Sequence, residues 1–460
     1  MKRKIVTLFV CITIFSGAGS AWAGNANLLD ASTESEHLTP KVIMPFGFYS
    51  TADGEPLRNK ACINYLKPLA DSGVSFLGPY YGVNDNAHQD CYAAAQALGM
   101  KAIKQLVPLG ADGQRPAIFV DKNLPVYAAP TACAGGVAAS QNTRQLDVAT
   151  QIALMVNAVL DDPVASQVVA WWSVSPEELR SWKSEEMCYL KLVRDTIRTT
   201  EKARKAPARP IMMYEPSNRT ASGLQITGQF LDMQLQGAYY GHLPKDNMNP
   251  CIAARSPNYS VDDPCWIDAI DHNMKEALKA RAINKNTPLV ALNMNKDYEV
   301  SDAQVLGYVR RAVYAGLLDG AQGVMVWSYV TRPGFTAKKR DVVLTAYKSV
   351  AKDLNGSLNL APYFMRGEVV TSTLPVNLVE GNSVTQLRFR QYRYNGKNLL
   401  ISMNVSDTDS VSANIPQNGN SRRAMGVVSS NVNVPDAAIG SDGKIHVSLK
   451  PMQIGMWFLE

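Results

Sequence analysis

The sequence predicts an α/β fold, a (β/α)8 TIM barrel followed by a small all-β sandwich domain. Eight apolar, β-branched runs alternate with segments of helical periodicity. The connections from each helix to the next strand are short, and those from each strand to the next helix are longer. After the last barrel helix, the sequence changes to short strand-like runs separated by turn residues. We assign residues 41–360 to the barrel and residues 361–460 to the β-sandwich domain.

The N-terminus has the pattern of a secretory signal peptide. Basic residues 2–4 precede a short apolar run that ends in the small-residue sequence Ala21-Trp-Ala23. We expect cleavage after Ala23, a flexible leader over residues 24–40, and a periplasmic or secreted protein. The apolar run is too short to span a bilayer as a helix, so we expect no membrane anchor.

The charge balance argues against nucleic acid as a partner. The chain has 46 Lys+Arg and 40 Asp+Glu, and loss of the three basic leader residues lowers its net charge to about +3. Five histidines without a His-Glu-x-x-His motif, and cysteines without paired spacing, give no support for a metal site. We expect no cofactor, and the sequence leaves the oligomeric state open.

Six cysteines remain after the predicted cleavage, an even number for a chain sent to an oxidising compartment. Cys251 and Cys265 bracket one polar loop and are the first predicted disulfide pair. Cys62 and Cys91 fall on the first two predicted helices and are a second possible pair.

Each predicted barrel strand is a run rich in β-branched and aromatic residues. The eight are Val42–Tyr49, Val74–Tyr80, Lys101–Val107, Val168–Ser175, Pro210–Glu215, Asp232–Tyr239, Leu289–Asn295 and Gly323–Tyr329. The loops after the third and sixth strands, roughly residues 108–143 and 241–263, are far longer than such connections usually are. Long loops at one end of the barrel predict a cleft there.

Two adjacent carboxylates follow the fourth predicted strand. Pro176 ends that strand, so Glu177 and Glu178 begin the loop at the carboxyl end of the barrel, where TIM-barrel active sites lie. Glycoside hydrolysis needs two carboxyl groups across the scissile bond, and either residue, Glu177 first, is a candidate general acid. The alternative is that both open the next helix and interact with its dipole.

Glu215 ends the fifth predicted strand and is the candidate second carboxylate, acting as nucleophile or base. Its alternative role is a salt bridge to nearby Arg219 or a hydrogen bond within the loop. Asp297, after the seventh strand, is a further acidic residue at the same end, with a solvated loop charge as its alternative.

Aromatic and polar residues near the predicted strand ends can stack on sugar rings or bind their hydroxyls. The predicted substrate-binding residues are Tyr80, Trp172, Tyr239, Tyr240, His242, Asn293, Asn295, Asp297 and Trp327. Because side chains alternate along a strand, part of this set is expected to pack inside the protein instead.

The strand order, the glutamates after strand four and the trailing β domain resemble the retaining superfamily of cellulase- and galactosidase-like (β/α)8 glycoside hydrolases, over residues 41–460. In that superfamily the acid/base glutamate follows strand four, which matches Glu177 or Glu178. The nucleophile glutamate ends strand seven, where this chain has Asn295. The resemblance implies a glycoside hydrolase that diverges at strand seven. Three alternatives follow: Glu215 or Asp297 takes the place of the nucleophile, the enzyme inverts through a water, or the protein is a glycan-binding or envelope-polysaccharide accessory protein without catalysis.

Overall fold

The computed structural model describes thirteen segments of the chain. They are residues 41–49, 62–78, 89–108, 148–175, 177–217, 219–238, 265–293, 301–327, 337–370, 377–380, 386–419, 421–429 and 431–460.

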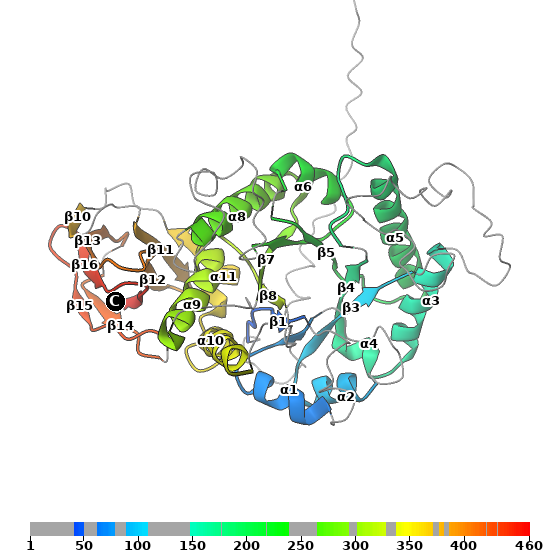
Figure 1. Ribbon diagram of the computed structural model, residues 1–460, viewed down its shortest axis with the longest axis horizontal. Coiled ribbons are helices and arrows are strands. Elements are labelled where there is room, and N and C mark those ends of the chain that lie inside the picture. The colour runs from blue at the N-terminus through cyan, green and yellow to red at the C-terminus, as the bar shows by residue number, and fades with distance from the viewer. Residues whose placement is uncertain are drawn as a thin grey trace, which may run out of the picture.

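Eight parallel strands form a closed barrel in sequence order, as Figure 1 shows. The strands are β1 (Phe46–Phe48), β2 (Phe76–Leu77), β3 (Lys101–Leu106), β4 (Val169–Val174), β5 (Ile211–Glu215), β6 (Met233–Gly237), β7 (Thr287–Asn293) and β8 (Val324–Trp327). Pairing of β1 with β8 closes the ring. Every strand overlaps a predicted one, so the predicted (β/α)8 barrel is confirmed.

Helices surround the strands. They are α1 (Cys62–Ala70), α2 (Gln89–Ala97), α3 (Val148–Asp161), α4 (Ala165–Val168), α5 (Ser184–Ala203), α6 (Ala221–Thr227), α8 (Cys265–Asn284), α9 (Asp302–Leu318) and α10 (Ala337–Asn355), with α11 (Ala361–Arg366) after them. Helix α9 begins with a complete capping box, because Ser301 and Gln304 each bind the other's backbone N–H.

Side chains of the barrel strands alternate between two apolar environments. The inner one is a compact cluster that includes Phe76, Ile103, Trp171, Met212 and Met325, so the barrel interior is filled rather than hollow. Phe76 and Trp171 stack there with ring centroids 4.3 Å apart.

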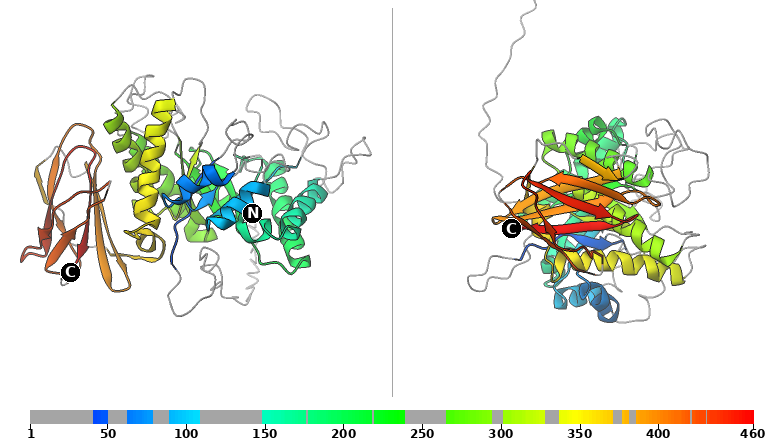
Figure 2. Two further views of the ribbon diagram at one scale, coloured as in Figure 1. Left: turned by 90° about the horizontal axis from the view of Figure 1, so that it is seen from below. Right: turned by 90° about the vertical axis from the view of Figure 1, so that its left-hand side faces the viewer.

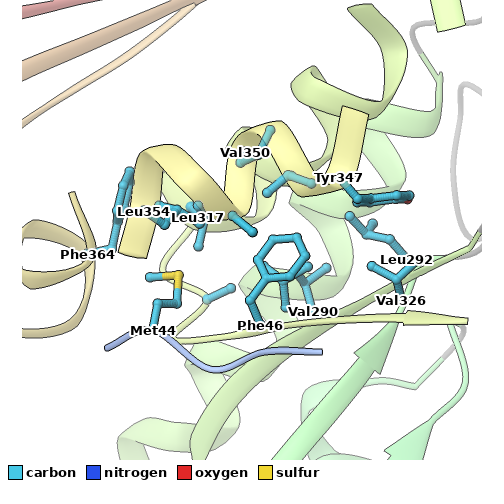
Figure 3. Close-up of a cluster of buried hydrophobic side chains, with 14 of the residues drawn as sticks. Met44, Phe46, Val290, Leu292, Leu317, Val326, Tyr347, Val350, Leu354 and Phe364 are labelled. Atoms are coloured by element: carbon cyan, nitrogen blue, oxygen red, sulfur yellow. The ribbon is translucent and has the colours of Figure 1, made fainter. Parts of the chain in front are cut away.

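The outward-facing residues of the strands pack against the helices. Figure 3 shows this layer, in which Phe46, Val290 and Val326 from the strands face Tyr347 and Val350 of α10. All five are buried.

The C-terminal strands form two antiparallel sheets, which confirms the predicted β domain. One sheet has the order β10 (Asn377–Glu380), β13 (Val411–Pro416), β16 (Lys444–Leu449), and the other has the order β15 (Ala437–Ala438), β14 (Arg423–Gly426), β17 (Ile454–Leu459), β12 (Lys397–Asn404), β11 (Leu387–Tyr394), β9 (Glu368–Val370). A tight hairpin joins β11 to β12, with Asn395 and Gly396 both at positive φ, as the Asn-Gly sequence favours.

The β domain packs beside helices α9 and α10, as both views of Figure 2 show. The buried Arg311 of α9 forms an ion pair with Asp407 and donates to the carbonyl of Val405. Asp353 of α10 accepts a hydrogen bond from Ser429 at 3.1 Å and another from Asn431. Buried polar contacts thus fix the β domain to one side of the barrel.

A buried asparagine joins the first and last barrel segments. Asn355, at the end of α10, accepts from the Met44 N–H at 2.7 Å across 311 positions of sequence. Its amide donates to the carbonyls of Met44 at 2.9 Å and Gly73 at 2.8 Å. The chain entering β1 is therefore held by the last barrel helix.

The described disulfide joins Cys62 of α1 to Cys91 of α2, with their Cα atoms 5.0 Å apart. This was the second possible pair in the sequence. Cys188 of α5 is also disulfide-bonded. The first predicted pair, Cys251 and Cys265, includes a residue outside the described segments.

Candidate active site at the barrel mouth

The candidate site lies at the barrel mouth, by which we mean the end where the carboxyl ends of β1–β8 lie. The interior below it is closed by the buried Tyr49, which follows β1, and Tyr214 of β5. Gly237 of β6 makes room for Tyr214, because a Cβ atom there would lie 2.2 Å from the tyrosine hydroxyl. A ligand of the barrel would therefore bind above these rings.

Glu177 lies at this mouth. The Tyr49 hydroxyl donates a hydrogen bond of 3.4 Å to Glu177 Oε1, so the carboxylate of the β4–α5 loop (residues 175–183) reaches the first strand. Tyr49 belongs to the cluster that fills the barrel, and Glu177 therefore lies over the interior. Glu177 is partly exposed, which leaves its carboxylate accessible.

Glu178 shapes the same loop. Its φ of 62° lies in the left-handed region, and its N–H donates to the Tyr214 carbonyl at 3.1 Å. A backbone turn of this kind separates the directions of the two adjacent glutamates, so their roles need not be equivalent.

Glu215 points away from the barrel interior, whereas a second catalytic carboxylate would face the mouth. Its neighbours Met212 and Tyr214 face the barrel interior, whereas Glu215 faces α6. Thr227 donates to Glu215 Oε1 at 2.6 Å, and Arg219 Nε binds Oε2 at 3.2 Å. The alternative salt bridge to Arg219 is thus confirmed.

Burial dominates the electrostatics of Glu215. The side chain has no exposed surface, and loss of hydration raises its pKa to about 7. The charge of Arg219 and the Thr227 hydrogen bond oppose this rise in pKa. Glu215 is therefore a buried carboxylate whose ionisation falls near neutral pH.

Arg219 connects Glu215 to the β4–α5 loop. Besides its salt bridge, its Nη2 donates to the Glu178 carbonyl at 3.0 Å and to the Leu179 carbonyl. Since Arg219 is only 4% exposed, these bonds form in a poorly hydrated environment where they are strong. The guanidinium fixes the backbone directly after Glu177.

Helix α5 fixes the loop from its other side. The Tyr189 hydroxyl donates to the Ser175 carbonyl at 2.6 Å, and Glu186 accepts from the Arg180 N–H at 2.5 Å while pairing with the Arg180 guanidinium. The loop that carries Glu177 is therefore held on both flanks.

The two described aromatic candidates differ in position. Trp172 is fully buried, and its Nε1 donates to Glu201 of α5 at 2.8 Å, so it packs in the helix layer instead of forming a sugar platform. Trp327, the last residue of β8, is partly exposed and packs on the interior cluster at the mouth. Trp327 keeps the position that a platform requires.

Several predicted residues lie outside the described segments: Tyr80, Tyr239, Tyr240, His242, Asn295, Asp297 and Cys251. The backbone of Asn293 is described as the end of β7, paired with Trp327 of β8.

Sequence reasoning missed three residues of the site: Tyr49, Arg219 as a loop anchor, and Trp182. Trp182 lies in the β4–α5 loop and is 68% exposed, with the Arg219 guanidinium 5.1 Å from its ring centroid. The sequence feature that could have indicated Trp182 is its position five residues after Glu177, the candidate general acid.

No cluster of three or more His, Cys, Asp or Glu side chains suited to a metal occurs within the described segments. In the same segments, no helix has the length and apolar character needed to cross a membrane.

The fold and the mouth define a (β/α)8-barrel protein with a carboxyl-terminal β domain. Solved structures with a similar fold include glycoside hydrolases and a glucosyl transfer enzyme. An α-amylase from Geobacillus thermoleovorans, complexed with acarbose, has 10% identity and a TM-score of 0.52, over 91% of this chain and 98% of that one. The α-glucosyl transfer enzyme XgtA has 11% identity and a TM-score of 0.52, over 94% and 99%.

The bifunctional glucanase-xylanase CelM2 from a metagenome library has 12% identity and a TM-score of 0.50, over 92% and 96% of the two chains. No family model and no curated protein matches the sequence. These similarities confirm the predicted resemblance at the level of the fold.

Proposed function

We propose that the protein is a glycoside hydrolase that binds a polysaccharide or oligosaccharide at the barrel mouth, with Glu177 as its general acid. The observation that carries the proposal is the Tyr49–Glu177 hydrogen bond, which holds a partly exposed carboxylate over the filled barrel. The glycoside hydrolase fold of the similar structures supports a carbohydrate as the ligand.

The proposal assigns no chemistry to Glu215, because its two oxygens bind Thr227 and Arg219 in the helix layer. A second carboxylate is still required by the reaction. Asp297, the other residue that the sequence offers in place of a strand-seven nucleophile, lies outside the described segments.

Export to the periplasm or the medium belongs to the same proposal. The signal-like N-terminus motivates it, and the Cys62–Cys91 disulfide supports an oxidising compartment. The exported protein should begin at Gly24.

Reducing-end release from soluble xylan, cellohexaose, maltohexaose and bacterial envelope polysaccharides tests the function. Glu177→Gln should lower the rate roughly 10²–10⁴-fold, the contribution of a general acid. Glu185→Gln, in the first turn of α5, is the matched control because it removes the same charge nearby. Asp297→Asn and Glu178→Gln complete the series, and full activity of Glu177→Gln contradicts the assignment.

A non-catalytic glycan-binding protein is the second candidate. The placement of Glu215 away from the mouth favours it, because that placement removes one of the two predicted catalytic carboxylates. Saturable glycan binding without release, unchanged by Glu177→Gln, would identify this function.

A further inference from the structure

Trp182 has an exposure unusual for its size. Seven large hydrophobic side chains are exposed within the described segments, and Trp182 is the aromatic one among them. An isolated exposed apolar residue needs no explanation by itself, so its surroundings must indicate a role.

One face of the Trp182 ring is already covered. Arg219 lies 5.1 Å from the ring centroid, a cation–π distance, and the guanidinium is itself fixed by Glu215 and two backbone carbonyls. The indole thus lies on an immobilised support. Trp182 as a whole is still 68% exposed with Arg219 against its ring, so much of the side chain remains in contact with solvent.

The loop around Trp182 is also immobilised. Ser181 lies against the start of α6, since a Cβ on Gly223 would be 3.1 Å from the serine Oγ. Arg180 is fixed by Glu186 of α5. A flat apolar surface held in place loses little conformational entropy when it binds a ligand.

The position of Trp182 connects it to the candidate site. It follows Glu177 by five residues in one loop, so the two Cα atoms lie within about 18 Å of each other. Both belong to the β4–α5 loop at the barrel mouth.

We propose that Trp182 is a stacking platform that binds a sugar unit of a glycan chain away from the scissile bond. A pyranose ring presents an apolar C–H face that matches an aromatic ring, and its hydroxyls remain in water at such an exposed position. This inference rests on the proposed function, and it adds that the ligand is a chain long enough to span from Glu177 to Trp182.

Calorimetric titration with cellohexaose, xylohexaose and maltohexaose, each paired with its disaccharide, tests the platform. All proteins carry Glu177→Gln so that the ligand stays intact. Adding Trp182→Ala should weaken binding of the recognised hexasaccharide on the order of tenfold and leave the disaccharide unchanged. Trp182→Phe, which keeps a flat face, should recover most of that affinity.

Ile283→Ala is the matched control for loss of an exposed apolar side chain. Ile283 is 64% exposed near the end of α8, and that end leads into β7 at the opposite end of the barrel. It should leave every affinity unchanged.

Four outcomes overturn the inference. Equal hexasaccharide affinity of the Trp182→Ala and parent proteins would exclude the platform while leaving the proposed function intact. Equal weakening for the disaccharide and hexasaccharide would indicate general damage to the loop. A dimer of the parent in sedimentation that Trp182→Ala dissociates, with glycan affinity retained, would identify a protein contact. Absence of glycan binding by the parent would overturn the proposed function as well.

Discussion

At the scale of single residues, the direction of a side chain decides its role. Glu177 and Glu215 both follow apolar strands, yet Glu177 contacts Tyr49 over the barrel and Glu215 contacts Thr227 behind it. The strands are buried on both faces, so their sequences carry no alternation from which the inward face can be read. The sequence could therefore predict that glutamates end these strands but not which way they point.

Because Glu215 is buried, the free energy of unfolding should depend on pH, and the substitution Glu215→Gln tests this dependence. Its folded pKa, about 7, lies above the usual value of 4.5, so the folded state holds the proton more tightly. The contribution of Glu215 is complete below pH 4.5 and is lost as the pH rises to 7.

Relative to Glu215→Gln, the parent should thus lose up to about 3 kcal/mol of unfolding free energy between pH 4.5 and 8. Urea unfolding of both proteins at pH 5 and pH 8 measures the difference. Parallel pH profiles would show that Glu215 titrates normally.

At the scale of elements, side chains from two neighbouring elements anchor the β4–α5 loop at the mouth. Arg219 from the neighbouring loop and Tyr189 and Glu186 from α5 all bind its backbone. The sequence placed Glu177 in a loop, but these contacts join segments whose proximity depends on the closed barrel. Local patterns could not predict them.

Removal of the Arg219 anchor should destabilise the fold and loosen the loop. At pH 8, where Glu215 of the parent is ionised, Arg219→Met leaves a buried carboxylate unpaired and should cost about 3–5 kcal/mol of unfolding free energy. The Glu178 N–H, bonded to the Tyr214 carbonyl, should also lose protection from hydrogen exchange.

The double variant Arg219→Met/Glu215→Leu separates these effects. It should regain most of the stability because no unpaired charge remains, while exchange at Glu178 stays fast. Restored protection at Glu178 in the double variant would mean that Arg219 does not anchor the loop.

At the scale of the whole molecule, predictions from sequence were most successful where a pattern is local. Asn395-Gly396 is a sequence typical of the tight hairpin that it forms between β11 and β12, and Ser301 with Gln304 is typical of the capping box that begins α9. Strand β13 has the partly polar sequence Val-Ser-Ala-Asn-Ile-Pro, which does not indicate a strand by itself. Its pairing partner β16, distant in sequence, stabilises it.

Besides Glu215, a carboxylate at the contact between the barrel and the β domain also has a raised pKa. Asp271 of α8 is buried beside Asp319, and burial together with that acidic neighbour raises its pKa, while Arg388 of β11 and Lys275 lower it. This part of the interface is stabilised at low pH, and the stabilisation is lost as the pH rises above the usual range of an aspartate.

Asp319→Asn should therefore stabilise the protein at pH 8, on the order of 1–2 kcal/mol, because Asp271 can then ionise beside Arg388 without a like charge. At pH 4 the substitution should have little effect. Thermal unfolding at both pH values measures this. Asp268→Asn, which removes an exposed partner of Arg388, is the control and should change stability by less than about 0.5 kcal/mol at either pH.

The hydrogen bonds of Asn355 to Met44 and Gly73 have a consequence for synthesis of the chain. Strand β1 cannot complete the ring until β8 has emerged, and the segment entering β1 is secured only when Asn355 reaches Met44. Until then the nascent barrel has two unpaired strand edges, which are sites for association with other chains. A ribosome releasing this polypeptide thus delivers nearly all of the barrel before its first strand has a permanent neighbour on both sides.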